Sequence, residues 1–165
     1  MTGSPQEPPL WLLDVDGVVN ALDPGQHAWP DFTTFRARGF TIRYSPSLLA
    51  RVAALHAQGR VEVRWLTTWW ETANQHLGEA FGLPELVVAN TEQEFSARGQ
   101  WWKLPVAQRL RAETGRRLVW TDDDLTHVDD AVDWVRAQGD EVLAISPNTY
   151  VGLTPADLDT IEAWV

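Results

Sequence analysis

The chain has 165 residues, a net charge of −10 and no cysteine. Its length fits one compact domain, and the lack of cysteine excludes disulfides, thiolate metal sites and cysteine nucleophiles. The acidic balance argues against a broad nucleic-acid footprint, because clustered Lys and Arg bind phosphate backbones. No apolar run reaches the roughly 18 residues of a membrane span, and the start lacks a signal-peptide pattern, so we expect a cytoplasmic protein.

Strand-like and helix-like segments alternate after a proline-rich start. Residues 1–9 are predicted to be a disordered tail, and residues 10–165 to form a single domain. The expected strands are 10–15, 61–67, 86–89, 117–121 and 141–146, and the expected helices are 46–58, 73–82, 102–113, 128–139 and 155–164. This alternation predicts an α/β, three-layer, Rossmann-like fold with a central parallel sheet of about five strands.

A β-hairpin is predicted between the first strand and the first helix. Residues 32–35 and 40–44 are aromatic and rich in Thr, and a glycine lies in the link between them. The hairpin carries Arg36, Arg38 and Arg43, which we interpret as a solvated face. The alternative is contact with a phosphorylated substrate.

Polar side chains follow the predicted strands. Asp14 and Asp16 end the first strand, Thr67 the second and Asp122 the fourth, and Lys103 begins the preceding helix. In open α/β sheets, ligands bind beyond the carboxyl ends of the strands. Two carboxylates in one crevice repel each other unless they share a cation or a proton. The sequence therefore predicts a charged site at this edge of the sheet.

The residue types at this edge indicate phosphoryl transfer. Carboxylate oxygens, with no soft ligand beside them, are the donors that Mg²⁺ prefers. One carboxylate can attack phosphorus, and a second carboxyl group can protonate the leaving oxygen and later activate water. A hydroxyl group and an ammonium group can stabilise the phosphoryl oxygens in the transition state.

These segments resemble the four motifs of the haloacid dehalogenase-like (HAD) superfamily, in the family order. The segment with Asp14 and Asp16 resembles the first motif, Thr67 the second, Lys103 the third and Asp122 the acidic fourth. Motif one alone is moderately specific, whereas four motifs in order are strong evidence. The resemblance extends over nearly the whole chain.

The resemblance implies a role for each of these residues. Asp14 would be the phosphorylated nucleophile, and Asp16 the general acid and then the general base. Mg²⁺ would be held by Asp14, the backbone carbonyl of Asp16 and Asp122, and by Asp123 directly or through water. An aspartate two residues after the nucleophile is typical of the phosphatases and phosphomutases, whereas the dehalogenases lack it. A magnesium-dependent phosphatase is the expected activity.

Two positions have neighbours that fit the same role. Thr68 is the alternative to Thr67 as the second-motif hydroxyl, although the strand register favours Thr67. Asp124 is the alternative to Asp123 as the second acidic ligand.

Aromatic residues flank the second and third motifs. They are Trp69, Trp70, Trp101 and Trp102. We interpret them as packing at helix starts, with an aromatic wall that stacks on a substrate ring as the alternative. The candidates for substrate contact are Thr68, Trp69 and His27, the last from the loop before the hairpin.

In this family a cap domain is inserted after the first motif or between the second and third motifs. The corresponding gaps here, 17–61 and 68–102, have no room for a large cap, so the resemblance implies a capless member. An open site suits a macromolecular substrate or a lid from a neighbouring subunit.

The substrate classes considered are a small phosphometabolite, a nucleotide and a nucleic-acid end. Residues 65–69 also resemble small bacterial HAD-like proteins, some related to domains fused to RNA-repair enzymes, although the acidic charge gives nucleic acid no support. The alternative function is a non-catalytic binding protein that retains the cation site.

Overall fold

The computed structural model describes residues 7–23, 25–96 and 101–165. The strands are β1 (Leu10–Leu13), β2 (Thr33–Ala37), β3 (Phe40–Tyr44), β4 (Glu62–Trp65), β5 (Val87–Val88), β6 (Leu118–Thr121) and β7 (Val142–Ile145). The helices are α1 (Pro46–Ala57), α2 (Thr72–His76), α3 (Gly78–Phe81), α4 (Glu92–Phe95), α5 (Lys103–Thr114), α6 (Asp129–Gln138) and α7 (Pro155–Trp164), with short 3-10 turns η1 (Leu125–His127) and η2 (Gly139–Glu141).

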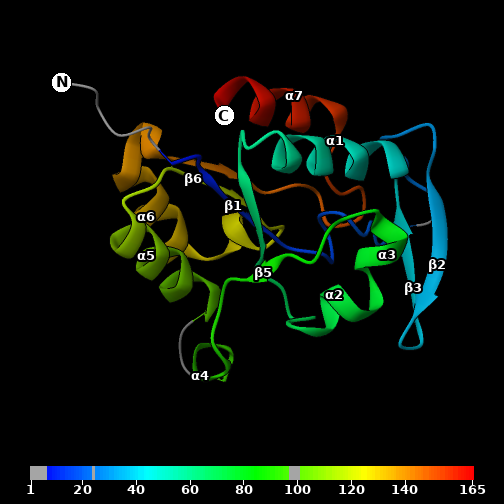
Figure 1. Cartoon of the computed structure of the whole chain (residues 1–165), viewed down its shortest axis with the longest axis horizontal. Coiled ribbons are helices and arrows are strands. Elements are labelled where there is room, and N and C mark those ends of the chain that lie inside the picture. Colours follow the sequence, from blue (N-terminus) through cyan, green and yellow to red (C-terminus); the bar gives the residue numbers. More distant parts are fainter. Residues whose placement is uncertain (1–6, 24, 97–100) are drawn as a thin grey trace.

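The main sheet has five parallel strands in the order β5-β4-β1-β6-β7. The central strand, β1, is buried along its whole length, as its uninterrupted apolar sequence predicts. Helices cover both faces of this sheet, and no large cap occurs in the part of the chain that the structure describes (Figure 1). The predicted three-layer α/β architecture is therefore confirmed.

Alternate side chains of β1 enter two separate cores. Trp11 and Leu13 pack in the core that includes α1 and α7, whereas Leu10 and Leu12 pack in the core that includes α5 and α6. Figure 1 shows these two helix pairs on opposite sides of the sheet. The indole N–H of Trp11 donates to Thr121 Oγ1 at 2.9 Å, so even a fully buried ring has a polar partner across the sheet.

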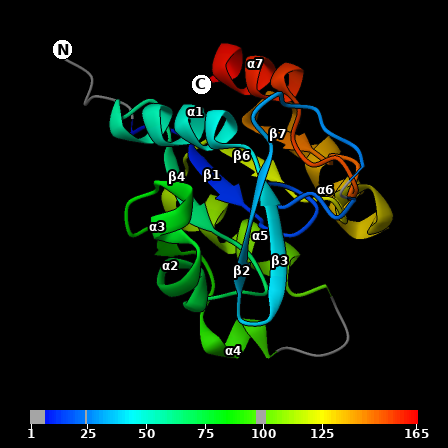
Figure 2. The same ribbon diagram turned by 90° about the vertical axis from the view of Figure 1, so that its right-hand side faces the viewer.

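The hairpin of β2 and β3 forms its own two-stranded sheet. Its turn consists of two residues, Arg38 and Gly39, because Ala37 pairs directly with Phe40. Both turn residues have positive φ, 49° at Arg38 and 85° at Gly39, as the right-handed twist of a two-residue hairpin requires. In Figures 1 and 2 the hairpin lies on the side toward which β1 points.

Two segments between β4 and α5 differ from expectation. The predicted helix 73–82 is divided into α2 and α3 at Leu77, directly before Gly78, a residue type that disfavours a helix interior. The stretch expected to be polar and irregular contains α4, which a reciprocal capping box between Thr91 and Glu94 begins. These short elements occupy the sequence gap in which a cap would be inserted.

The predicted tail falls only partly within the described residues, because residues 1–6 lie outside them. The carbonyl oxygen of Pro9 accepts a hydrogen bond from the backbone N–H of Glu62 at 2.9 Å. The carbonyl of Pro8 accepts from Arg116 Nε at 2.6 Å. The end of this segment is thus joined to the sheet. Among the described residues, no helix combines the length and apolar character needed to cross a membrane.

Candidate active site

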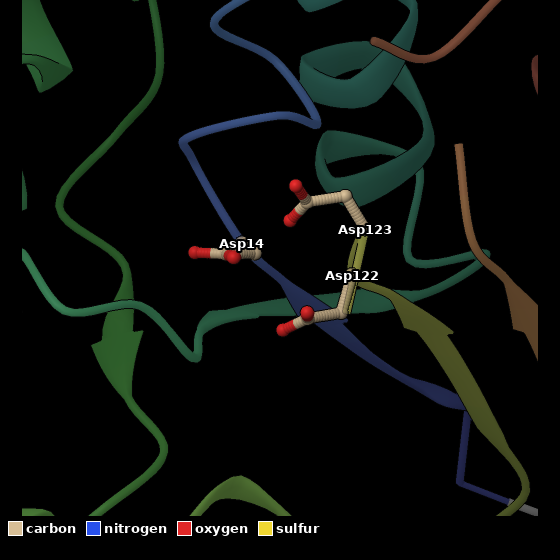
Figure 3. A group of neighbouring side chains, drawn as sticks. All are labelled: Asp14, Asp122 and Asp123. Atoms are coloured by element: carbon tan, nitrogen blue, oxygen red, sulfur yellow. The ribbon is translucent and has the colours of Figure 1, made fainter. Parts of the chain in front are cut away.

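Three carboxylates converge beyond the ends of two adjacent strands. Asp14 follows β1 and Asp122 follows β6, and the last residues of these strands, Leu13 and Thr121, are paired in the sheet. Oxygen atoms of Asp14, Asp122 and Asp123 lie within 4.8 Å of one another (Figure 3). Asp14 and Asp122 are buried, and Asp123 is partly exposed.

A buried lysine joins two of these carboxylates. Lys103 Nζ donates to Asp14 Oδ2 at 2.7 Å and to Asp122 Oδ2 at 2.5 Å. Its side chain is only 4% exposed, because the first turn of α5 directs it beneath the rings of Trp101 and Trp102, each with its centroid 5.8 Å from Nζ. The ammonium is thereby fixed between two groups from distant parts of the chain.

One ammonium does not neutralise this cluster. Burial opposes the charge of Lys103, but the carboxylates of Asp14 and Asp122 outweigh it and raise the pKa of Lys103 above its usual value. Burial and the neighbouring Asp14 raise the pKa of Asp122, in spite of its ion pair with Lys103. Burial, with a further contribution from Asp14, also raises the pKa of Asp123. A single positive charge is thus shared by two buried carboxylates, with the carboxylate of Asp123 beside them.

The donor set fits a hard divalent cation. It consists of carboxylate oxygens, with no sulfur or imidazole in the cluster. Three carboxylates with a single ammonium between two of them carry more negative charge than Lys103 can balance, which favours a bound cation. Asp14, Asp122 and Asp123 are therefore the side chains that could hold Mg²⁺.

Asp123 is held in the cluster by its surroundings. Its Oδ2 accepts a hydrogen bond from Thr149 Oγ1 at 2.7 Å. A Cβ atom added to Gly17, whose φ is +74°, would lie 2.2 Å from this oxygen, so the glycine leaves the space that the carboxylate occupies. Asp124 is exposed and contributes only its backbone N–H, which donates to Asp122 Oδ1 at 3.0 Å. Of the two alternatives, Asp123 is the one beside Asp14.

Asp16 lies in a different environment. It is partly exposed, and both of its oxygens accept from neutral donors: Asn20 Nδ2 at 2.7 Å and Trp69 Nε1 at 2.9 Å. Asn20 in turn accepts from the backbone N–H of Arg43 at 2.8 Å. The carboxylate is thus oriented from two sides, by its own loop and by the loop after β4.

The two threonines after β4 occupy different positions. Thr67 is fully buried, and its Oγ1 accepts from the backbone N–H of Trp69 at 3.3 Å. Thr68 is exposed and faces a cleft between this loop and the hairpin. Burial thus separates the two threonines, and the choice of Thr67 as the second-motif hydroxyl stays a prediction.

Asp16 lies in the wall of this cleft, which has a volume of about 770 Å³. The cleft is lined by Asp16, Asn20, Leu22, Arg38, Gly39, Phe40, Thr41, Arg43, Thr68, Trp69 and Thr72. His27, a candidate for substrate contact, is absent from these lining residues and packs its ring against Phe32 at 4.6 Å. Of the three candidates for substrate contact, Thr68 and Trp69 line the cleft.

The four tryptophans near the site divide into two groups. Trp70 stacks on Phe95 and Trp101 stacks on Trp120, while the edge of Trp102 meets Phe95. These three pack as expected at helix starts. Trp69 instead lines the cleft and donates to the Asp16 carboxylate.

The sequence interpretation missed two residues of this region. Asn20 holds Asp16, and its position four residues after that aspartate, with an amide suited to a carboxylate, was the available signal. Phe40 lines the cleft with 64% of its surface exposed. A large exposed aromatic residue beside the turn glycine was the signal there.

The chain matches, over residues 10–158, the protein family described as the HAD domain in Swiss Army Knife RNA repair proteins. No curated protein and no solved structure matches it. The match includes both strand ends of the carboxylate cluster, the lysine of α5 and the hairpin. The family is one of hydrolase type, and the buried acidic cluster is present in this chain. The chain therefore belongs to the HAD domain family of the Swiss Army Knife RNA repair proteins.

Proposed function

We propose that this protein is a magnesium-dependent phosphatase that works through an aspartyl-phosphate on Asp14. The observation that carries the proposal is the position of the Asp14 carboxylate, which lies against Lys103 and within 4.8 Å of oxygens of Asp122 and Asp123. A nucleophile for an anionic phosphoryl group needs positive charge beside it, and Lys103 together with a cation would supply that charge.

The reaction would proceed in two steps. An oxygen of Asp14 attacks phosphorus, the bond from phosphorus to the leaving oxygen breaks, and Asp16 gives its proton to that oxygen. Water then attacks phosphorus of the aspartyl-phosphate while Asp16 takes a proton from the water, which releases inorganic phosphate and restores Asp14. The two hydrogen bonds that Asp16 accepts keep this carboxyl group in one orientation for both transfers.

The cation would be held by Asp14, Asp122 and Asp123 together with the backbone carbonyl of Asp16. When bound, Mg²⁺ would neutralise negative charge on the phosphoryl oxygens. Lys103 remains between Asp14 and Asp122 and keeps the two carboxylates from repelling each other before substrate enters.

Candidate substrates are a phosphorylated metabolite, a nucleotide and a phosphorylated nucleic-acid end. The family description, which names RNA repair proteins, supports the last of these. The alternative is a non-catalytic binding protein that retains the cation site. The presence of Asp16 in an oriented, accessible position argues against it, because cation binding alone would not need a second side-chain carboxyl group in the cleft.

Hydrolysis of an aryl phosphate with and without Mg²⁺ is the direct test. We expect turnover that depends on the metal and falls below detection in Asp14→Asn, with the same circular dichroism spectrum as the unchanged protein. Wild-type turnover by Asp14→Asn would exclude this nucleophile. Magnesium binding without turnover on a broad panel of phosphoesters would support the binding protein instead.

A further inference from the structure

The positions of the cleft beside Asp16 and of the buried cluster of Asp14, Lys103 and Asp122 indicate where the two parts of a substrate would bind. A general acid must lie next to the oxygen that leaves, so the leaving group occupies the space that Asp16 faces. Asp16 lines the cleft between the hairpin and the loop after β4, whereas Lys103 and Asp122 are buried beside Asp14. If Asp14 is the nucleophile, the non-phosphoryl part of the substrate therefore extends into this cleft. This step rests on the proposed function.

The walls of the cleft carry aromatic surface. Phe40 is 64% exposed, and its ring meets that of Trp69 edge to face, with centroids 6.0 Å apart and an angle of 71° between the planes. The exposed ring of Phe40 borders the cleft, so its surface is open to a ligand that enters there. A planar ring can stack on such surface, as nucleic-acid bases do on aromatic side chains.

Two guanidinium groups border the same space. Arg38 is held at the hairpin turn, where its Nη1 donates to Thr72 Oγ1 at 3.3 Å, and Arg43 lies on β3. Among the described residues, neither arginine has a carboxylate within ion-pair distance, although Arg43 contributes to lowering the pKa of Asp23. Guanidinium groups without an ion pair are suited to phosphate oxygens.

The charge of the cleft contrasts with its surroundings. The chain has a net charge of −10, yet the charged residues that line this cleft are Asp16, Arg38 and Arg43. The groove on the other side of α2, beside β5, is lined by Glu71, Glu85 and Glu92 with no basic residue among its described lining. An anionic ligand would be repelled from that groove and directed to the hairpin side.

We propose that the hairpin cleft binds a leaving group that contains a nucleobase and a second phosphate, as in the terminal nucleotides of a nucleic acid or a nucleoside bisphosphate. The base lies against Phe40 and Trp69, and the second phosphate is bound by Arg38 and Arg43. A volume of about 770 Å³ is sufficient for a nucleotide, since pockets for ligands of that size span about 300–1,000 Å³. Trp69 has a double role, because it forms the wall and orients Asp16.

Substrate competition within one set of variants tests the cleft. The probes are an oligonucleotide with a terminal phosphate, a nucleoside bisphosphate, a sugar bisphosphate and an aryl monophosphate. For Arg43→Ala we expect kcat/KM to fall by about 10-fold or more on the first two probes, and by less on the aryl phosphate, which has no second phosphate. For Phe40→Ala we expect a fall of about 10-fold on the first two probes and a smaller one on the sugar bisphosphate, which has no aromatic ring. Arg36→Ala is the matched control for charge on the hairpin, because the Arg36 side chain does not itself line the cleft and donates to the Gly39 carbonyl oxygen and to Thr41 Oγ1.

Binding separates failure of the cleft from failure of the proposed function. In the Asp14→Asn background, calorimetry with the oligonucleotide and the bisphosphate should give a Kd that Arg43→Ala weakens by about 10-fold and Arg36→Ala leaves unchanged. This holds even if no phosphoester is turned over. The better of the two nucleotide probes identifies the source. A sugar bisphosphate that binds as tightly as either, or equal losses for Arg43→Ala on the nucleotide and aryl substrates, would overturn the proposal.

Discussion

Asp14 and Asp16 are separated by one residue, yet the protein treats their carboxylates in opposite ways. Asp14 is buried, lies 2.7 Å from an ammonium and is surrounded by two more carboxylates. Asp16 is partly exposed, accepts from an indole and an amide, and borders an open cleft. The first environment holds a carboxylate in place and keeps water from it, whereas the second gives a carboxyl group the access to water that proton exchange needs. The difference agrees with the proposed roles, in which Asp14 attacks phosphorus and Asp16 transfers the proton.

The largest expected effect is a loss of kcat in Asp16→Asn, which tests the difference between Asp14 and Asp16. Loss of the general acid should lower kcat by about 10²–10⁴-fold for alkyl phosphates, whose leaving oxygens need a proton. The loss should be much smaller for aryl phosphates with acidic leaving groups. Steady-state kinetics over a series of leaving groups measures this slope. A uniform loss across the series would show that Asp16 does not donate the proton.

The second effect concerns the stability of the buried cluster. Lys103→Met leaves Asp14 and Asp122 without their shared partner and should lower the free energy of unfolding by about 3–5 kcal/mol in metal-free buffer. Added Mg²⁺ should restore part of the loss. Urea unfolding with and without the metal measures both.

The matched control for Lys103→Met is Arg51→Met. Arg51 forms ion pairs of 2.6 and 2.7 Å with Asp159 and Glu162 at the surface, where such pairs contribute about 0–1 kcal/mol each. If the two variants lost equal free energy of unfolding, the buried carboxylates would depend on Lys103 no more than the surface carboxylates depend on Arg51.

A third, smaller effect is expected at Gly17. Gly17→Ala and Gly59→Ala both place a side chain at positive φ, which costs about 1–3 kcal/mol. Only at Gly17 does the new Cβ collide with Asp123, because Gly59 has no atom within 4 Å of that position. Both variants should lose stability, but only Gly17→Ala should also bind Mg²⁺ more weakly. Equal metal affinity would show that Asp123 is not a ligand.

The smallest effect is a pH dependence of metal binding. Because burial and Asp14 raise the pKa of Asp122, protons compete with Mg²⁺, and its Kd should rise by up to about tenfold per unit as the pH falls below that pKa. Without metal, the folded state holds this proton more tightly than the unfolded state does, so the contribution of Asp122 to stability is lost as the pH rises through the raised pKa. Calorimetry and urea unfolding over a pH series measure both, and a flat Mg²⁺ affinity would contradict the assignment.

The carboxylate cluster could be predicted from the sequence because its geometry follows from the sheet. Residues that end adjacent parallel strands must lie side by side, and an aspartate directly after an apolar strand indicates the edge of the sheet at which the polar side chains lie. The choice between Asp123 and Asp124 could not be predicted in this way. It depends on which residue of a turn faces the space that Gly17 leaves free, and three successive acids give no pattern.

The cleft could not be predicted from the sequence, for a different reason. Its walls come from a hairpin and a loop that no shared strand aligns, and their spacing depends on the contacts of Asn20 with Arg43 and of Arg38 with Thr72. The same applies to Trp69, which is one of two adjacent tryptophans. Trp70, with φ of 48°, turns toward Phe95, and Trp69 turns toward Asp16. Such long-range choices have no local periodicity to reveal them.

The position of Asn20 has a consequence for how this protein can diversify. Its amide connects Asp16 to the base of the hairpin, at Arg43. Among the described residues, the far end of the hairpin meets the loop after β4 and the start of α2 through the ring contact of Phe40 with Trp69 and the hydrogen bond from Arg38 to Thr72. Replacements at the turn would alter what the cleft recognises without moving the acid. Substitutions at the turn could therefore change which substrate binds while the reaction at the base of the hairpin stays the same.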